Sequence, residues 1–124
     1  MRKTDPELIA KKFNDCINAG DLEGLTKLMT DDHTFIDRDG TRTKSKKKMT
    51  DSWKSFFEMF PKYKNTFTMI RSTGNLVTMT GYAIWTDERP CDNVIWTARI
   101  SSDLVSEWRI YEDTDLNRQL LNLT

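Results

Sequence analysis

Asp37 is the acidic residue whose position first suggests chemistry. It lies in the stretch "DDHTFIDRDG" at residues 31–40, which also holds the chain's only histidine, His33. Strand alternation places His33, Phe35 and Asp37 on one side of this stretch. A carboxylate at the wall of an apolar cavity loses hydration and becomes a usable base near neutral pH. The pattern therefore favours Asp37 as a candidate base for proton transfer.

A turn is the alternative interpretation of the same residue. Asp37 can open the "DRDG" turn and accept backbone hydrogen bonds there. His33, which follows the Asp31-Asp32 pair, is the second candidate catalytic residue. We expect it either at the rim of a site or in a hydrogen bond with one of those two acids.

Aromatic side chains supply the candidate ligand-binding residues. The chain has 4 tryptophans among its 124 residues. Such bulky side chains either fill a core or form the walls of a pocket for a flat or cyclic apolar molecule. The candidates are Phe13, Trp53, Phe56, Tyr63, Trp85, Trp96 and Trp108. Tyr63, Trp96 and His33 are also candidate hydrogen-bond donors to a ligand.

Charge and cysteine content argue against several other kinds of site. The 19 basic and 19 acidic residues balance, so no overall field attracts nucleic acid or an anionic membrane. Cys16 and Cys91 lie far apart with no histidine near either, which predicts reduced thiols in place of a zinc set or a disulfide framework. "DRDG" resembles the start of a calcium loop but lacks its later acid. We expect no metal and no cofactor.

Hydropathy and length bear on location and domain number. No segment approaches the ~18 apolar residues of a membrane span. The N-terminal "MRKTDPELIAKKF" lacks the long apolar region of a secretory signal. We expect a cytoplasmic protein with a single domain over residues 1–124.

Helical spacing dominates the first half of the chain. Asp5-Pro6 opens a predicted helix over about 5–19, which Gly20 ends. Asp21 caps a second helix, whose apolar face consists of Leu22, Leu25, Leu28 and Met29. After a short strand and a polar connection, Ser45 caps a third helix that ends at Pro61.

Alternation replaces helical spacing from residue 65 onward. Four predicted strands are "NTFTMIRS", "NLVTMTGYAIW", "NVIWTARIS" and "LVSEWRIYE", and the tail "DTDLNRQLLNLT" predicts a short helix. One sheet face is apolar. The other face carries Thr78, Thr80, Tyr82, Thr97, Arg99, Glu107, Arg109 and Tyr111. This mixed face predicts a homodimer interface.

The element order and several motifs resemble those of a known superfamily. The motifs are "NAGDLEGLTKLM", "DDHTFID", "SWKSFFEMFP" and "EWRIYED". They resemble the nuclear-transport-factor-2-like superfamily, in particular its SnoaL-like and ketosteroid-isomerase-like members. The resemblance implies an α+β fold, a cone-shaped curved antiparallel or mixed sheet wrapped around three N-terminal helices.

The resemblance carries over to individual residues only in part. Asp37 falls where ketosteroid isomerases keep the aspartate that moves a proton next to a carbonyl. Phe13 stands where those enzymes have a tyrosine, and Trp96 where they have a second acid. In SnoaL-type cyclases an acid of the final strand acts as general acid or base, and the corresponding stretch here offers Glu107, Glu112, Asp113 and Asp115 without singling one out.

Two function classes follow from the resemblance. The first is a small protein that binds a hydrophobic ligand, apolar or cyclic, and catalyses a cofactor-independent isomerisation, cyclisation or dehydration by proton transfer. The second is a non-catalytic module for ligand binding, dimerisation or association.

Overall fold

The computed structural model describes residues 5–86 and 91–123. Three helices come first, α1 (Pro6–Ala19), α2 (Leu22–Lys27) and α3 (Lys46–Met59), with β1 (Met29–Ile36) and β2 (Arg42–Lys44) between the second and the third. The strands β3 (Lys64–Thr73), β4 (Leu76–Ile84), β5 (Asp92–Ser101) and β6 (Leu104–Glu112) follow, and α4 (Asp115–Leu120) ends the fold.

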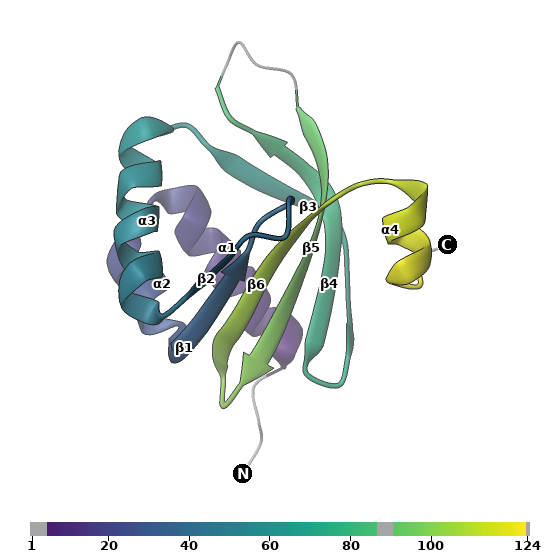
Figure 1. The fold of residues 1–124 in the computed structure, drawn as a ribbon, viewed down its shortest axis with the longest axis horizontal. Helices are drawn as coiled ribbons and strands as arrows, with labels where there is room; N and C mark the ends of the chain where they lie inside the picture. Colours follow the sequence, from purple (N-terminus) through teal and green to yellow (C-terminus); the bar gives the residue numbers. More distant parts are fainter. Residues whose placement is uncertain (1–4, 87–90, 124) are drawn as a thin grey trace.

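The six strands form one mixed sheet in the order β2-β1-β6-β5-β4-β3. Among the described residues, β1 and β6 pair in parallel and the other four pairings are antiparallel. The curved sheet wraps around α1, α2 and α3, while α4 lies on its opposite side (Figure 1). This is the α+β cone that the sequence predicts.

Local sequence signals fix the helix ends as predicted. The Asp5 carboxylate accepts a hydrogen bond from the Glu7 backbone N–H at 3.0 Å, and Gly20 ends α1 in the left-handed region with φ 64°. Ser45 caps α3 by accepting from the Lys48 N–H at 3.1 Å. These caps satisfy backbone groups that a helix end leaves unpaired.

Two predicted boundaries are wrong. Met29 belongs to β1 instead of to the apolar face of the second helix, because the chain there pairs with Val105 of β6. Residues 42–44, predicted as part of a polar connection, form β2 and pair with β1. A strand of three residues at a sheet edge has too short an alternation to be recognised in a sequence.

The sheet bends where β3 carries a register shift between Phe67 and Met69. Gly81 of β4 lies opposite this irregularity, and a Cβ atom there would approach the carbonyl oxygen of Thr66 to 1.9 Å. No side chain fits at that distance, so glycine is what permits the close approach of the two backbones.

The core fills the space between the helices and the inner sheet face. Phe13 and Ile17 of α1 pack with strand residues such as Met79, Trp96 and Trp108, all 1% exposed or less. None of the helices in residues 5–86 and 91–123 has the length and apolarity that a membrane span requires.

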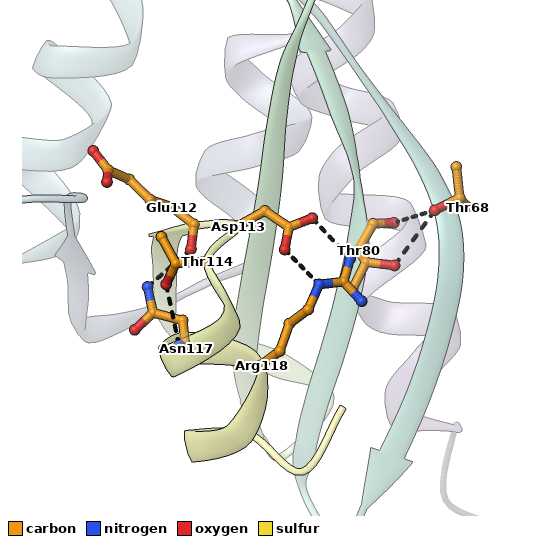
Figure 2. A network of polar contacts seen from close by, with 7 residues as sticks. All are labelled: Thr68, Thr80, Glu112, Asp113, Thr114, Asn117 and Arg118. Carbon is orange, nitrogen blue, oxygen red and sulfur yellow. Dashed lines mark hydrogen bonds and ion pairs between the residues drawn. The ribbon is translucent and has the colours of Figure 1, made fainter. Parts of the chain in front are cut away.

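The outer sheet face, whose mixed character the sequence predicts, is in part buried within one chain. Thr78, Thr80 and Thr97 are buried within the single chain. The hydroxyl of Thr68 donates to the Thr80 carbonyl at 3.2 Å, and Arg118 of α4 binds Asp113 through contacts of 2.5 and 2.8 Å (Figure 2). The homodimer interface itself stays a prediction.

Candidate functional site

A pocket of about 160 Å³ opens between α3 and the sheet. It lies where β1 and β4 end, and residues from β1, α3, β6 and three connecting segments line it. The lining residues are Phe35, Asp37, Arg38, Met49, Ser52, Trp53, Phe56, Tyr63, Trp85 and Ile110. Five of these ten are aromatic, so most of the wall is apolar.

The aromatic rings brace one another edge to face. Phe56 and Tyr63 have ring centroids 4.8 Å apart at 83°, and Tyr63 and Trp85 have centroids 4.9 Å apart at 72°. Phe60 supports Trp85 from outside the pocket lining at 5.1 Å. Such T-shaped contacts are a favourable geometry for aromatic pairs, and they hold the wall in place without a ligand.

Trp53 forms the buried part of the wall. Its ring stands at 82° to Phe35 and 86° to Phe56, with centroid distances of 6.0 and 5.5 Å. The side chain is 6% exposed, and its indole Nε1 has no hydrogen-bond partner in residues 5–86 or 91–123.

Asp37 both caps the turn and lines the pocket. Its carboxylate accepts the backbone N–H of Arg38 at 2.7 Å. Its own N–H donates to the Thr41 carbonyl, and its carbonyl accepts from Gly40 N–H, both at 2.9 Å. The residue is exposed at the pocket mouth. These contacts match the turn interpretation of Asp37, and its role as a base stays a prediction.

A shared carboxylate oxygen links the two sides of the mouth. Asp92 Oδ2 accepts a hydrogen bond from Trp85 Nε1 at 2.8 Å and lies 3.7 Å from Arg38 Nη2. Arg38 comes from the turn after β1, and Asp92 begins β5. The contact ties the β1–β2 turn to the start of β5 at the edge of the pocket.

Tyr63 brings a neutral phenol to the same region. Burial raises its pKa to about 12, while the nearby Arg38 cation opposes that rise. The charges of Asp92 and Asp37 add to the rise. Tyr63 is thus protonated throughout the physiological pH range and can donate a hydrogen bond.

The structure brings together four of the seven aromatic candidates proposed from the sequence as ligand-binding residues. Trp53, Tyr63 and Trp85 line the pocket, and Phe56, the further aromatic candidate, joins them. Phe13, Trp96 and Trp108 do not: they are at most 1% exposed and pack within the core. Trp96 lies against Phe67, with ring centroids 5.1 Å apart.

His33 is neither at the rim nor bonded to Asp31 or Asp32, so that expectation is wrong. Its side chain is fully buried, with Nδ1 2.7 Å from the Val105 carbonyl and the ring 5.7 Å from that of Phe13. Burial lowers the pKa of His33 below its usual value. The parallel β1–β6 pairing places the ring against β6, a pairing that local alternation cannot reveal.

Sequence reasoning missed several lining residues. The sequence marks Arg38 only as part of the turn that Asp37 opens, Ser52 fits no pattern, and alternation places Ile110 on the apolar sheet face without indicating a pocket. The four acids proposed for the final strand and tail, Glu107, Glu112, Asp113 and Asp115, are not among the lining residues. Glu107 instead pairs with Arg99 at 3.5 Å, and Asp113 binds Arg118.

Comparison with known proteins shows the family of this chain and the proteins that share its fold. The fold is shared with cystatin-fold, NTF2-like and SnoaL-like proteins of known structure. A family model for the SnoaL-like domain matches residues 10–116, and the chain belongs to that family. No curated protein matches the chain in sequence.

Solved structures with low sequence identity share the fold. A cystatin-fold protein of uncharacterised function from Novosphingobium aromaticivorans has a TM-score of 0.79 at 19% identity, covering 88% of this chain and 99% of its own. A candidate SnoaL-like polyketide cyclase from Shewanella putrefaciens has a TM-score of 0.79 at 14% identity, covering 99% and 89%. An LEH-like epoxide hydrolase from M. tuberculosis has a TM-score of 0.75 at 16% identity, covering 94% and 90%.

Proposed function

We propose that the protein binds a small planar apolar molecule in the pocket between α3 and the sheet. One observation carries the proposal: a pocket of about 160 Å³ with five aromatic residues in its lining. An apolar protein cavity of about 150 Å³ accommodates benzene. The pocket therefore suits a single ring, with any substituent directed to the mouth.

The four tryptophans provide a test with an internal control. Trp53 and Trp85 line the pocket, whereas Trp96 and Trp108 lie in the core. We expect millimolar toluene to shift the indole N–H resonances of the first pair in ¹H–¹⁵N spectra and to leave those of the second pair nearly unchanged. Equal shifts at all four indoles, or none, would contradict the proposal.

Proton transfer is the second candidate function, and the position of Asp37 at the pocket lining favours it. The carboxylate would remove a proton from the carbon next to a ligand carbonyl and return it to another atom, as isomerisation, cyclisation and dehydration require. Tyr63, a neutral donor in the same lining, would stabilise the oxygen on which negative charge develops.

Exchange of α-protons tests this step without knowledge of the natural substrate. In D₂O, the wild type should accelerate loss of the α-proton signals of cyclohexanone, and Asp37→Asn should lose the acceleration. Asp39→Asn is the matched control, because Asp39 belongs to the same turn but does not line the pocket. Equal rates in wild type and Asp37→Asn would exclude Asp37 as the base.

Association through the outer sheet face is proposed for the oligomeric state. Arg109 of β6 packs over the Tyr111 ring at 4.5 Å, and Arg99 on the same face is exposed. Aromatic and arginine side chains are typical of interfaces. Light scattering should give a dimer mass for the wild type and a lower mass for Tyr111→Glu. A monomer mass for the wild type would contradict the proposal.

A further inference from the structure

Arg38 is a partly buried cation whose hydrogen-bonding capacity is unused. Its side chain is 27% exposed and lines the aromatic pocket. Its one ion pair in residues 5–86 and 91–123 is the 3.7 Å contact of Nη2 with Asp92. In the same part of the chain its guanidinium group donates no hydrogen bond. A guanidinium group has five N–H donors.

The contact with Asp92 is too long to occupy those donors. Charge-assisted N–H···O hydrogen bonds have lengths of about 2.7–2.9 Å, and arginine commonly makes two of them to one carboxylate. Asp92 Oδ2 instead accepts from Trp85 Nε1 at 2.8 Å. Arg38 is thus held near the mouth by attraction, with donors still available to a ligand.

Charge at the mouth limits what that ligand can be. Among residues 5–86 and 91–123, Asp37 and Asp92 bring two acidic side chains to the mouth and Arg38 brings one basic side chain. A ligand carboxylate would meet both acids as well as the arginine, and like charges at this range repel. A neutral oxygen acceptor avoids that repulsion and still uses the guanidinium donors. The charges of the same three side chains also act on the Tyr63 hydroxyl.

We propose that Arg38 is a specificity-determining residue that donates hydrogen bonds to a neutral carbonyl oxygen on a ring-sized ligand. The proposal rests on the proposed function, since it requires that the pocket bind a ring. It assigns the ligand class as small cyclic or aromatic ketones, esters or lactones, in preference to hydrocarbons and carboxylic acids.

Three probes of similar size separate the alternatives: acetophenone, toluene and benzoate. Their affinities are measured by titration of the Trp85 indole resonance in wild type, Arg38→Met, Arg38→Lys and the control Arg42→Met. Arg42 lies exposed on β2 outside the pocket lining. A hydrogen bond to a charged group contributes enough to change an affinity by about 10-fold to 100-fold.

The expected result is that wild type binds acetophenone at least about 10-fold more tightly than toluene or benzoate. Arg38→Met should abolish the preference for acetophenone over toluene, and wild-type positions of the Trp96 and Trp108 indole resonances would show that the variant is folded. Arg38→Lys should retain part of the preference, and Arg42→Met all of it.

Other outcomes overturn the inference in distinguishable ways. Equal binding of toluene and acetophenone, unaffected by Arg38→Met, would remove Arg38 from recognition and leave the proposed function standing. Tightest binding of benzoate, lost in Arg38→Met, would show that Arg38 recognises an anion. Binding of none of the three would overturn the proposed function together with this inference.

Discussion

The pocket and the core around His33 are both built from aromatic side chains, but only the pocket is open. In the core, Phe13 packs against Trp108 with ring centroids 4.7 Å apart and against His33 at 5.7 Å. All three side chains are 1% exposed or less. In the pocket, Tyr63 and Trp85 are as close to each other, yet they border a cavity of about 160 Å³.

The position of these residues relative to the ends of the strands explains why one region is packed and the other is open. His33 and Trp108 lie inside paired strands, where neighbouring strands and α1 occupy the surrounding volume. Asp37, Arg38 and Trp85 lie where strands have just ended. His33 and Trp108 are therefore part of the packed core, whereas Asp37, Arg38 and Trp85 border the pocket. Phe13, the position that resembles the isomerase tyrosine, lies in α1 and packs in the same core.

The largest expected effect is the loss of Phe13 from the core. Phe13→Ala should lower the free energy of unfolding by about 3–5 kcal/mol, because a fully buried ring leaves a cavity that the structure can only partly fill. Phe60→Ala, which removes a half-buried ring beside the pocket, should cost less than half as much. Denaturant unfolding of both variants measures the contrast, and equal losses would show that the two regions do not differ in packing.

The next effect is a dependence of stability on pH through His33. Burial, the largest influence, lowers the pKa of His33 in the folded state, although the hydrogen bond to Val105 and the charge of Asp32 oppose this. Between the folded pKa and the unfolded value of about 6.5, the unfolded chain binds more protons. Stability is therefore fully present above about pH 6.5 and falls as the pH drops toward the folded pKa.

Unfolding free energies at pH 7.5, 6.5 and 5.5 check the sign. Each tenfold difference in proton affinity between the two states corresponds to about 1.4 kcal/mol. Because His33 is the only histidine, His33→Gln is a suitable control and should flatten the dependence over this range. A wild type that gains stability as the pH falls would contradict the buried, neutral imidazole.

The fold was largely predictable from local patterns, and the site only in part. Asp5, Asp21 and Ser45 are caps readable in the sequence, and the alternation in residues 76–112 gave the apolar sheet face. The pocket residues Trp53, Tyr63 and Trp85 were recognised by type, but so were Trp96 and Trp108. Alternation assigns a side chain to a face of the sheet and says nothing of whether the space in front of it is filled.

Arg38 and His33 show why the other features of the site and the core could not be predicted from the sequence. The position of Arg38 at the pocket depends on its contact with Asp92, which lies 54 residues further along the chain (92 minus 38). The burial of His33 depends on the parallel pairing of β1 with β6. Both follow from contacts between distant segments, which spacing within one segment does not encode.

A smaller effect is expected from separating the two roles of Asp92. Asp92→Asn keeps a side-chain oxygen for Trp85 Nε1 and removes the charge that attracts Arg38. A partly exposed ion pair contributes about 0.2–1 kcal/mol, so unfolding should change little. The Trp85 indole resonance should remain near its wild-type position in Asp92→Asn and move in Asp92→Ala. Movement of equal size in both would show that charge, and not the hydrogen bond, positions the Trp85 ring.

The smallest expected change in stability is that of Asp37→Asn, and it bears most directly on the contrast between site and core. Asparagine retains an oxygen that can accept the Arg38 N–H, and it suits turns as well as aspartate does. The free energy of unfolding of the Asp37→Asn variant should stay within about 0.5 kcal/mol of wild type, as for most surface substitutions. Asp37→Ala, which removes the acceptor, should lose about 0.5–1.5 kcal/mol. A residue needed for folding alone would tolerate asparagine in every assay. Loss of α-proton exchange in a fully stable Asp37→Asn protein would therefore show that Asp37 acts in the chemistry of the pocket and not in the stability of the fold.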